Sequence, residues 1–191
     1  MNNKNKITRE DCMSAIKTII KYFEGNSDRD GLKKTPERVF KSYEETLSGY
    51  NKDPSLELKS VFEKENSYSD MVIVKGIDIV SKCEHHMLPI IGTADIAYLP
   101  NNKIVGISKL ARVADIFSRR LQTQENLTSQ IAECIYNNLD CLGVAVLIDA
   151  RHSCMSIRGT TKTNSTTVTS CMLGEFSTNN ELKKEFYAKL K

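Results

Sequence analysis

All three histidines of the sequence lie within three residues of a cysteine, in two short runs, 83–86 and 152–154. Thiolate sulfur and imidazole nitrogen are ligands that zinc favours in proteins. The two-residue gap between Cys83 and His86 lets one loop supply two of them, and Cys154 supplies a third. Three protein ligands leave a fourth position for water, which is the arrangement of a catalytic zinc site. The histidines left over as acid and base groups beside the ion are His85 and His152.

Two alternatives to an open zinc site stay in view. The histidines and cysteines could be unrelated core residues, as a lone Cys-x-x-His pair often is. A closed structural site could instead use His85 or His152 as a fourth ligand, which would leave one histidine free. The clustering of every histidine beside a cysteine favours a metal site over the first alternative.

Helices and strands are segregated along the chain, which predicts an α+β fold with a mostly antiparallel sheet rather than alternating βα units. The first helical pattern begins with a capping box formed by Thr8 and Asp11. Both metal runs are predicted near the ends of strands. The predicted helices are 8–24, 35–49, 108–117, 123–139 and 181–191, and the predicted strands are 71–80, 92–99, 104–107, 144–150, 155–158 and 166–173.

The composition excludes several classes of protein. The chain has 191 residues, of which 40% are hydrophobic and 27% charged, as in an ordinary soluble domain. The net charge of +3, from 27 basic and 24 acidic residues, argues against nucleic-acid binding. No apolar run is long enough to span a membrane, and residues 1–6 do not resemble the start of a secretory signal. We therefore expect a cytoplasmic protein with no membrane partner.

The predicted domain organisation has two parts. Residues 1–70 are expected to form an N-terminal helical segment that ends in a polar loop over 51–70. Residues 71–191 contain the predicted sheet, the helix pair and both metal runs, so they are expected to form the catalytic domain.

Five cations and one hydroxyl could hold a polyanion. Two of the cations share a face of the helix 35–49, two follow a serine at the start of the helix 108–117, and one follows the second metal run. A helix N-terminus with a hydroxyl and two cations favours a phosphate group. Each of these charges alone is more often a solvated surface residue, but together they would suit a triphosphate. The set is Arg38, Lys41, Ser108, Lys109, Arg112 and Arg158.

A carboxylate near the start of the helix 123–139 could recognise a guanine base. If buried, Glu125 could accept two hydrogen bonds from the N–H groups of a guanine edge, with Gln122 and Gln124 nearby. Locally, the better interpretation is an acidic residue that the helix dipole stabilises.

Taken together, several motifs resemble those of GTP cyclohydrolase I. They occur in order and with their spacing intact from about Thr8 to Phe176. The combination is highly specific, although no single motif would be. The motifs are Thr35–Arg38, Cys83–His86 with Gly92, Gly106–Arg112, Gln122–Thr128, His152–Gly159 and Thr166–Ser170.

The resemblance implies a zinc enzyme that converts GTP and water to 7,8-dihydroneopterin triphosphate and formate, the first step of folate and pterin biosynthesis. It implies that zinc activates the water that attacks C8 of guanine. His152 resembles the proton donor for ring opening, and His85 a second acid/base group. The implied zinc ligands are Cys83, His86 and Cys154; the implied guanine contacts are Glu125 and Gln124; and the implied triphosphate contacts are Arg38, Lys41, Ser108, Lys109, Arg112 and Arg158.

The resemblance also implies a tunnelling fold, in which an antiparallel sheet is backed by two antiparallel helices. Subunits of such proteins join their sheets into a barrel, and two five-membered rings stack into a homodecamer with active sites at subunit interfaces. Arg38 and Lys41 are then expected to serve the site of a neighbour. Asn126 departs from the family, which usually has arginine there, and we expect this to reduce stability or affinity more than activity.

Two other functions compete with this interpretation. A zinc-stabilised scaffold could have kept the fold and lost catalysis, but it would be expected to lack some of the acid/base and phosphate residues. A related tunnelling-fold enzyme could act on a pterin or a deazapurine. The pair of cysteine ligands and the five cations favour a triphosphate substrate.

Overall fold

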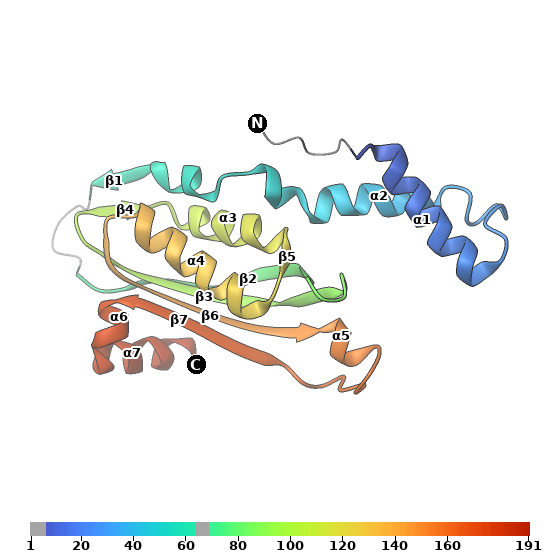
Figure 1. Ribbon diagram of the computed structural model, residues 1–191. Helices are drawn as coiled ribbons and strands as arrows, with labels where there is room; N and C mark the ends of the chain where they lie inside the picture. The colour runs from blue at the N-terminus through green and yellow to red at the C-terminus, as the bar shows by residue number, and fades with distance from the viewer. Residues whose placement is uncertain (1–6, 64–68) are drawn as a thin grey trace. The chain divides into compact units, whose positions relative to one another are not determined.

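The computed structural model describes residues 7–63 and 69–191 (Figure 1). The chain divides into two compact units, Met1–Ser48 and Gly49–Lys191, and each is described by itself. The division expected after residue 70 stays a prediction. The expected polar start at residues 1–6 and part of the expected loop, residues 64–68, lie outside the described residues.

The first unit contains two helices, α1 (Arg9–Glu24) and α2 (Thr35–Thr46). The predicted capping box is confirmed, because Thr8 Oγ1 accepts from the Asp11 amide at 3.1 Å and the Asp11 carboxylate accepts from the Thr8 amide at 2.9 Å. The guanidinium of Arg9 on α1 lies 5.2 Å from the centre of the Phe40 ring on α2, so a cation–π contact joins the pair.

The second unit is built on a five-stranded sheet in the order β5-β2-β3-β6-β7 (Figure 1). The four long strands are antiparallel neighbours, whereas the short β5 runs parallel to β2. A separate two-stranded sheet pairs β1 with β4. The strands are β1 (Val61–Glu63), β2 (Val72–Cys83), β3 (Pro89–Pro100), β4 (Lys103–Val105), β5 (Leu121–Gln122), β6 (Cys141–His152) and β7 (Thr167–Gly174).

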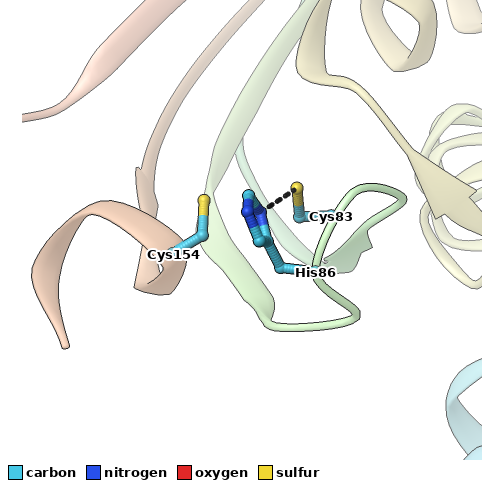
Figure 2. A group of neighbouring side chains, drawn as sticks. All are labelled: Cys83, His86 and Cys154. Atoms are coloured by element: carbon cyan, nitrogen blue, oxygen red, sulfur yellow. Dashed lines mark hydrogen bonds between the residues drawn. The ribbon is translucent and has the colours of Figure 1, made fainter. Parts of the chain in front are cut away.

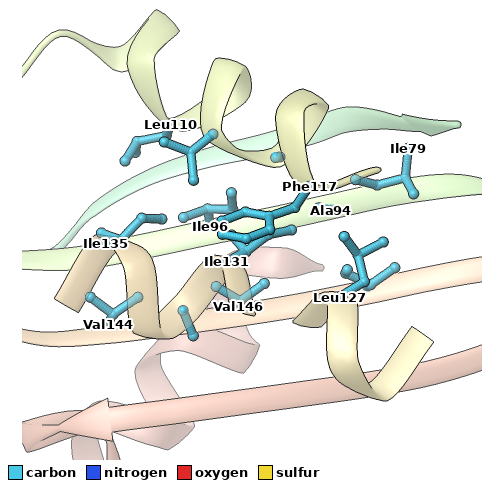
Figure 3. Close-up of a cluster of buried hydrophobic side chains, with 14 of the residues drawn as sticks. Ile79, Ala94, Ile96, Leu110, Phe117, Leu127, Ile131, Ile135, Val144 and Val146 are labelled. Carbon is cyan, nitrogen blue, oxygen red and sulfur yellow. The ribbon is translucent and has the colours of Figure 1, made fainter. Parts of the chain in front are cut away.

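Two antiparallel helices, α3 (Ile107–Ser118) and α4 (Gln124–Asn138), cover one face of this sheet. Their apolar stripes pack on the inward residues of β2, β3 and β6 to form the main core, as Figure 3 shows. Truncating one of these side chains to alanine typically costs about 2–5 kcal/mol. The expected α+β tunnelling architecture is therefore confirmed. Fully buried members of this core include Ile79, Ala94, Ile96, Leu110, Leu127, Ile131, Ile135, Val144 and Val146.

A smaller core lies on the other face of the sheet. It is closed by two C-terminal helices, α6 (Glu175–Thr178) and α7 (Asn180–Leu190), which contribute the buried rings of Phe176 and Phe186. The predicted C-terminal helix is thus present, although it ends one residue earlier. No described helix is long and apolar enough to cross a membrane.

Three details of the sequence prediction are wrong. Residues 155–158 do not form a strand: a short helix, α5 (Ser153–Ser156), precedes an exposed Ile157, because no neighbouring strand covers this segment. The expected loop 51–70 contains η2 (Pro54–Lys59) and β1, and the 3₁₀ turn η1 (Ser48–Asn51) comes just before them. Ser108 does not cap α3, which begins at Ile107 after Gly106.

The register of β3 against β6 decides which residues reach the end of the sheet. Ile90 pairs with His152, and Gly92 pairs with Ala150. The strands approach so closely that a Cβ at Gly92 would lie 2.1 Å from the Asp149 carbonyl oxygen. This register places the end of β6 beside the turn that joins β2 to β3.

Candidate metal centre and substrate pocket

Three side chains at this end of the sheet form a candidate metal centre. Cys83 is the last residue of β2, His86 lies in the turn after it, and Cys154 lies on α5 (Figure 2). One ligand atom from each lies within 4.8 Å of the others. The Sγ of Cys83 is 3.7 Å from Nδ1 of His86. The three residues predicted as ligands are therefore brought together from segments that are far apart in the sequence.

The turn that carries His86 is fixed by backbone hydrogen bonds. The Cys83 amide donates to the Leu88 carbonyl at 2.9 Å, and the Met87 amide donates back to the Cys83 carbonyl at 2.7 Å. Met87 has a φ of 55°, a left-handed conformation that is uncommon for a residue with a side chain. The Glu84 amide donates to the Gln122 carbonyl at 3.0 Å, which ties the turn to β5. The backbone thus holds the ligand loop in a defined shape.

The donor set fits a zinc ion. Two thiols and one imidazole are the ligands of a borderline-soft metal, and three of them leave a position open. Burial raises the pKa of the Cys154 thiol, the nearby Cys83 thiol raises it further, and the charge of Arg158 opposes both. A bound cation reverses this balance, because it stabilises the thiolates directly.

The two remaining histidines flank the metal centre in different surroundings. His85 lies on the same turn with 65% of its side chain exposed, and its Nδ1 is 3.9 Å from the Sγ of Cys83. His152 ends β6 and is partly covered. Its burial lowers its pKa, while the charge of Glu125 acts in the opposite direction. His152 is therefore biased toward the neutral ring that can accept a proton.

A buried amide orients His152. The Nε2 atom of His152 lies 2.7 Å from Oε1 of Gln124, a residue that is 1% exposed. The Gln124 Nε2 faces the carbonyl oxygens of Ile148 and Thr167 at 3.0 and 2.8 Å, and the hydroxyl of Thr169 at 3.1 Å. Carbonyl oxygens only accept, so the amide nitrogen must face them and Oε1 must face the histidine. His152 therefore carries hydrogen on Nε2 and, when neutral, a lone pair on Nδ1.

Sequence reasoning missed the residues that hold Gln124 in place. The Thr128 hydroxyl donates to the Gln124 carbonyl at 2.7 Å and lies 2.6 Å from the Thr169 hydroxyl. Two threonine-containing motifs, 122–128 and 166–170, carried a signal for these residues, but nothing in either motif indicates that the two meet.

A pocket of about 250 Å³ opens over the metal centre. The exposed Glu125 lies at its edge in the first turn of α4, beside the buried Gln124. The structure thus places the proposed guanine contact, both free histidines and the metal centre around one hollow. The pocket is lined by Cys83, His85, His86, Ile90, Gln122, Thr123, Gln124, Glu125, His152, Cys154, Met155 and Thr167.

The expected phosphate cations of α3 do not join this pocket within one chain. Ser108, Lys109 and Arg112 lie on the first two turns of α3, toward the sheet end where the Tyr98 hydroxyl accepts from the Val105 amide at 3.2 Å. Tyr98 is nine residues along β3 from the Pro89 end that carries the metal centre, or roughly 30 Å of extended strand. The two groups therefore occupy opposite ends of the second unit.

The other predicted cations are divided between the two units. Arg158 follows α5, close enough to Cys154 for its charge to affect that thiol. Arg38 and Lys41 are exposed on α2 in the first unit, where Lys41 forms an ion pair with Glu37 at 3.1 Å.

The chain is similar to known proteins over most of its length. The family model of GTP cyclohydrolase I matches residues 12–191. The chain is 49% identical over 181 residues to GTP cyclohydrolase 1 of Brucella anthropi, covering 95% of this chain and 85% of that protein. It is 48% identical over 182 residues to GTP cyclohydrolase 1 of Rickettsia felis, covering 95% and 96%. An apo structure of an archaeosine synthase QueF-Like aligns with a TM-score of 0.45 at 14% identity, over 57% of this chain and 97% of that chain.

Proposed function

The chain belongs to the GTP cyclohydrolase I family, and from that membership we propose how its residues share the conversion of GTP and water to 7,8-dihydroneopterin triphosphate and formate. The observation that carries the proposal is the meeting of Cys83, His86 and Cys154 beside two histidines in one pocket. A scaffold without catalysis would have no need of the buried network that orients His152.

Cys83, His86 and Cys154 are the proposed ligands of a zinc ion. When bound, zinc lowers the pKa of a water molecule and makes it a nucleophile near neutral pH. The turn that follows β2 and the helix α5 hold the three donors before the ion arrives. Because His85 and His152 are not needed as ligands, both are free for proton transfer.

His152 is the proposed proton donor for opening the guanine ring. Its Nε2–H donates to Gln124, so Nδ1, on the side away from that amide, must first take up the proton that it then gives to the guanine ring. The family resemblance implies a guanine contact for Gln124. Because its amide is already used by His152 and by buried acceptors, we propose instead that it positions His152. The more exposed His85 is the proposed second acid/base group.

Glu125 is the proposed guanine anchor. Its carboxylate can accept from two N–H groups on the edge of the base, and it lies at the rim of the pocket in the first turn of α4. The dipole of α4 favours a negative charge at that position.

The triphosphate is the proposed ligand of Ser108, Lys109, Arg112 and Arg158, with Arg38 and Lys41 completing the set. The α3 residues lie at the opposite end of the sheet from the metal centre, which favours a shared site. A neighbouring subunit would then supply them. A homo-oligomer, and the decamer in particular, provides such neighbours.

Two broader assignments belong to the same proposal. We divide the chain into an N-terminal helical segment, residues 1–70, and a catalytic domain, residues 71–191. We place the enzyme in the cytoplasm, where its nucleotide substrate is made and used.

Formate release and pterin fluorescence from purified protein incubated with GTP test the proposed function. Activity should vanish with a metal chelator and return with zinc. Zinc-loaded, assembled protein that releases no formate would contradict the proposed catalytic role, and chelator-resistant activity would contradict the metal assignment.

A further inference from the structure

One carboxylate already contacts two of the proposed phosphate cations. Oε2 of Glu57 lies 3.1 Å from Nζ of Lys109 and 3.4 Å from Nη1 of Arg112. Glu57 belongs to η2, which packs against the start of α3. The contact therefore joins two segments that are far apart in the sequence, and a single oxygen atom bridges both cations.

This ion-pair group is partly withdrawn from water. The side chains of Glu57 and Lys109 are 26% and 24% exposed, whereas that of Arg112 is 59% exposed. Charges that are partly covered by protein are screened less than fully exposed ones. The hydrogen bond from Lys109, followed by the charges of Lys109 and Arg112, lowers the pKa of Glu57, so the carboxylate is ionised at neutral pH.

A phosphate group bound by Lys109 and Arg112 must lie close to this carboxylate. Both anions compete for the same N–H donors, and their negative charges repel each other. Glu57 therefore opposes phosphate binding at the start of α3, even though the same contact holds the two cations in place before the ligand arrives.

We propose that Glu57 sets the affinity of the α3 cations for a triphosphate by weakening their hold on it. This inference rests on the proposed function, in which those cations bind the triphosphate of GTP. The product keeps the same triphosphate, so tighter phosphate binding would retain substrate and product alike. Such uniform binding lowers KM without accelerating the chemical step. Glu57 thus keeps the site from holding its product too tightly.

A variant that removes the charge of Glu57 but keeps its shape separates two effects of this residue, which are holding the cations in place and repelling phosphate. Glu57→Gln keeps an oxygen that can accept from Lys109, but it removes the repulsion. We expect inorganic tripolyphosphate to bind this variant about three- to tenfold more tightly at low salt, and we expect the gain to shrink as salt is added. Guanosine, which carries no phosphate, should bind both proteins equally.

Glu185→Gln is the matched control. Glu185 pairs with Lys189 at 2.6 Å on α7, across the sheet from α3 (Figure 1), so the variant removes the same charge from an ion pair elsewhere. It should bind tripolyphosphate as the unmodified protein does. If the gain appeared in both variants, the effect would be one of net charge and the proposal would fail.

Equal or weaker tripolyphosphate binding by Glu57→Gln would overturn the proposal, because Glu57 would then act only by holding the cations. Should Glu57→Gln fold poorly, Glu57→Asn and Glu57→Asp repeat the comparison with side chains that are one methylene shorter. The asparagine variant is expected to bind tripolyphosphate more tightly than the aspartate variant does. Calorimetric binding of tripolyphosphate involves no chemistry, whereas formate release from GTP does. A failure of Glu57's role is therefore distinguishable from a failure of the proposed catalytic function.

Discussion

Nε2 of His152 lies 2.7 Å from Oε1 of Gln124, and the carbonyl groups around Gln124 decide which of these two atoms carries hydrogen. The contact leaves Nδ1, the other ring nitrogen, as the atom of a neutral His152 that can take up a proton. The buried amide of Gln124 would in this way control which atom of the proposed acid/base group reacts.

Replacing Gln124 should therefore impair turnover while sparing the metal. Gln124→Met fills a similar volume without the amide, and we expect kcat to fall about 100-fold with a small change in KM and unchanged zinc content. The ¹⁵N chemical shifts of His152 in the metal-free protein should show hydrogen on Nε2 before the substitution and a mixture of tautomers after it. An unchanged tautomer would contradict the positioning role.

The hydroxyl of Thr128 allows a second test of whether Gln124 positions His152, because it holds the Gln124 backbone in place. Thr128→Val removes the bond to the Gln124 carbonyl and should lower kcat, whereas Thr128→Ser keeps the hydroxyl and should restore most of it. Equal activity of the two variants would show that the threonine acts by packing alone.

The metal assignment predicts two separable losses. Cys154→Ser should lose both zinc and formate release, because it removes a ligand. His152→Ala should keep zinc and lose activity by a factor of about 100 or more. Elemental analysis of the purified variants measures the first property and pterin fluorescence the second. A zinc-free His152 variant would mean that this histidine is a ligand.

A shared active site predicts complementation between inactive chains. Cys154→Ser lacks the metal centre, and the double variant Lys109→Ala with Arg112→Ala lacks the α3 cations. Each variant should be inactive alone. Co-expression should restore formate release, because some sites would then combine the intact metal ligands of one chain with the intact α3 cations of the other. Failure to recover activity in assembled mixed oligomers would argue that one chain supplies both halves.

Glu57 predicts a pH dependence of stability with a definite sign. Its pKa in the folded protein is lowered from 4.5 by the Lys109 hydrogen bond and the nearby cations. A group of this kind stabilises the fold above its unfolded pKa, and the stabilisation is lost as the pH falls through the folded pKa. The unmodified protein should therefore exceed Glu57→Gln in unfolding free energy at neutral pH. The difference should shrink as the pH falls below 4.5 and should vanish once Glu57 is protonated in the folded protein. Urea titrations from neutral to acidic pH measure the difference in unfolding free energy, and a difference that persists in acid would mean that Glu57 acts through packing.

Gly92 predicts a strong steric effect on folding. A methyl group there would meet the backbone of Asp149 and Ala150, which cannot move aside without disturbing the pairing of β3 with β6. Gly92→Ala should cost roughly 1–3 kcal/mol or prevent folding, as measured by urea unfolding. Gly106→Ala is the control, because its methyl group would find only an ordinary contact at 3.8 Å. A fully stable Gly92 variant would disprove the close approach.

The parts of this structure that sequence could predict are those with local signals. The two residues of the capping box, Thr8 and Asp11, are only three positions apart, and the helices α3 and α4 show clear apolar periodicity. The meeting of Cys83, His86 and Cys154 could be predicted because a two-residue gap and two strand ends mark these residues in the sequence.

The remaining features depend on contacts between distant segments. Glu57 meets Lys109 across the chain, and Gln124 meets Thr169, and neither contact has a spacing that a sequence pattern could show. The strand predicted at 155–158 is wrong because alternation of Met155 and Ile157 with polar residues does not show whether a neighbouring strand is present to pair with them. The distance between the α3 cations and the candidate metal centre could not be predicted from the sequence, because it depends on the register of the sheet.

The metal centre joins β2 and α5, which follows β6, although β3 lies between those strands in the sheet. An ion bound there would link the end of β2 to the segment after β6, across the intervening β3. The β2–β3 and β3–β6 pairings already bring these two segments together. We expect an ion bound there to slow hydrogen exchange at the end of β6, because opening this end of the sheet would then require breaking a bond between the metal and its ligand.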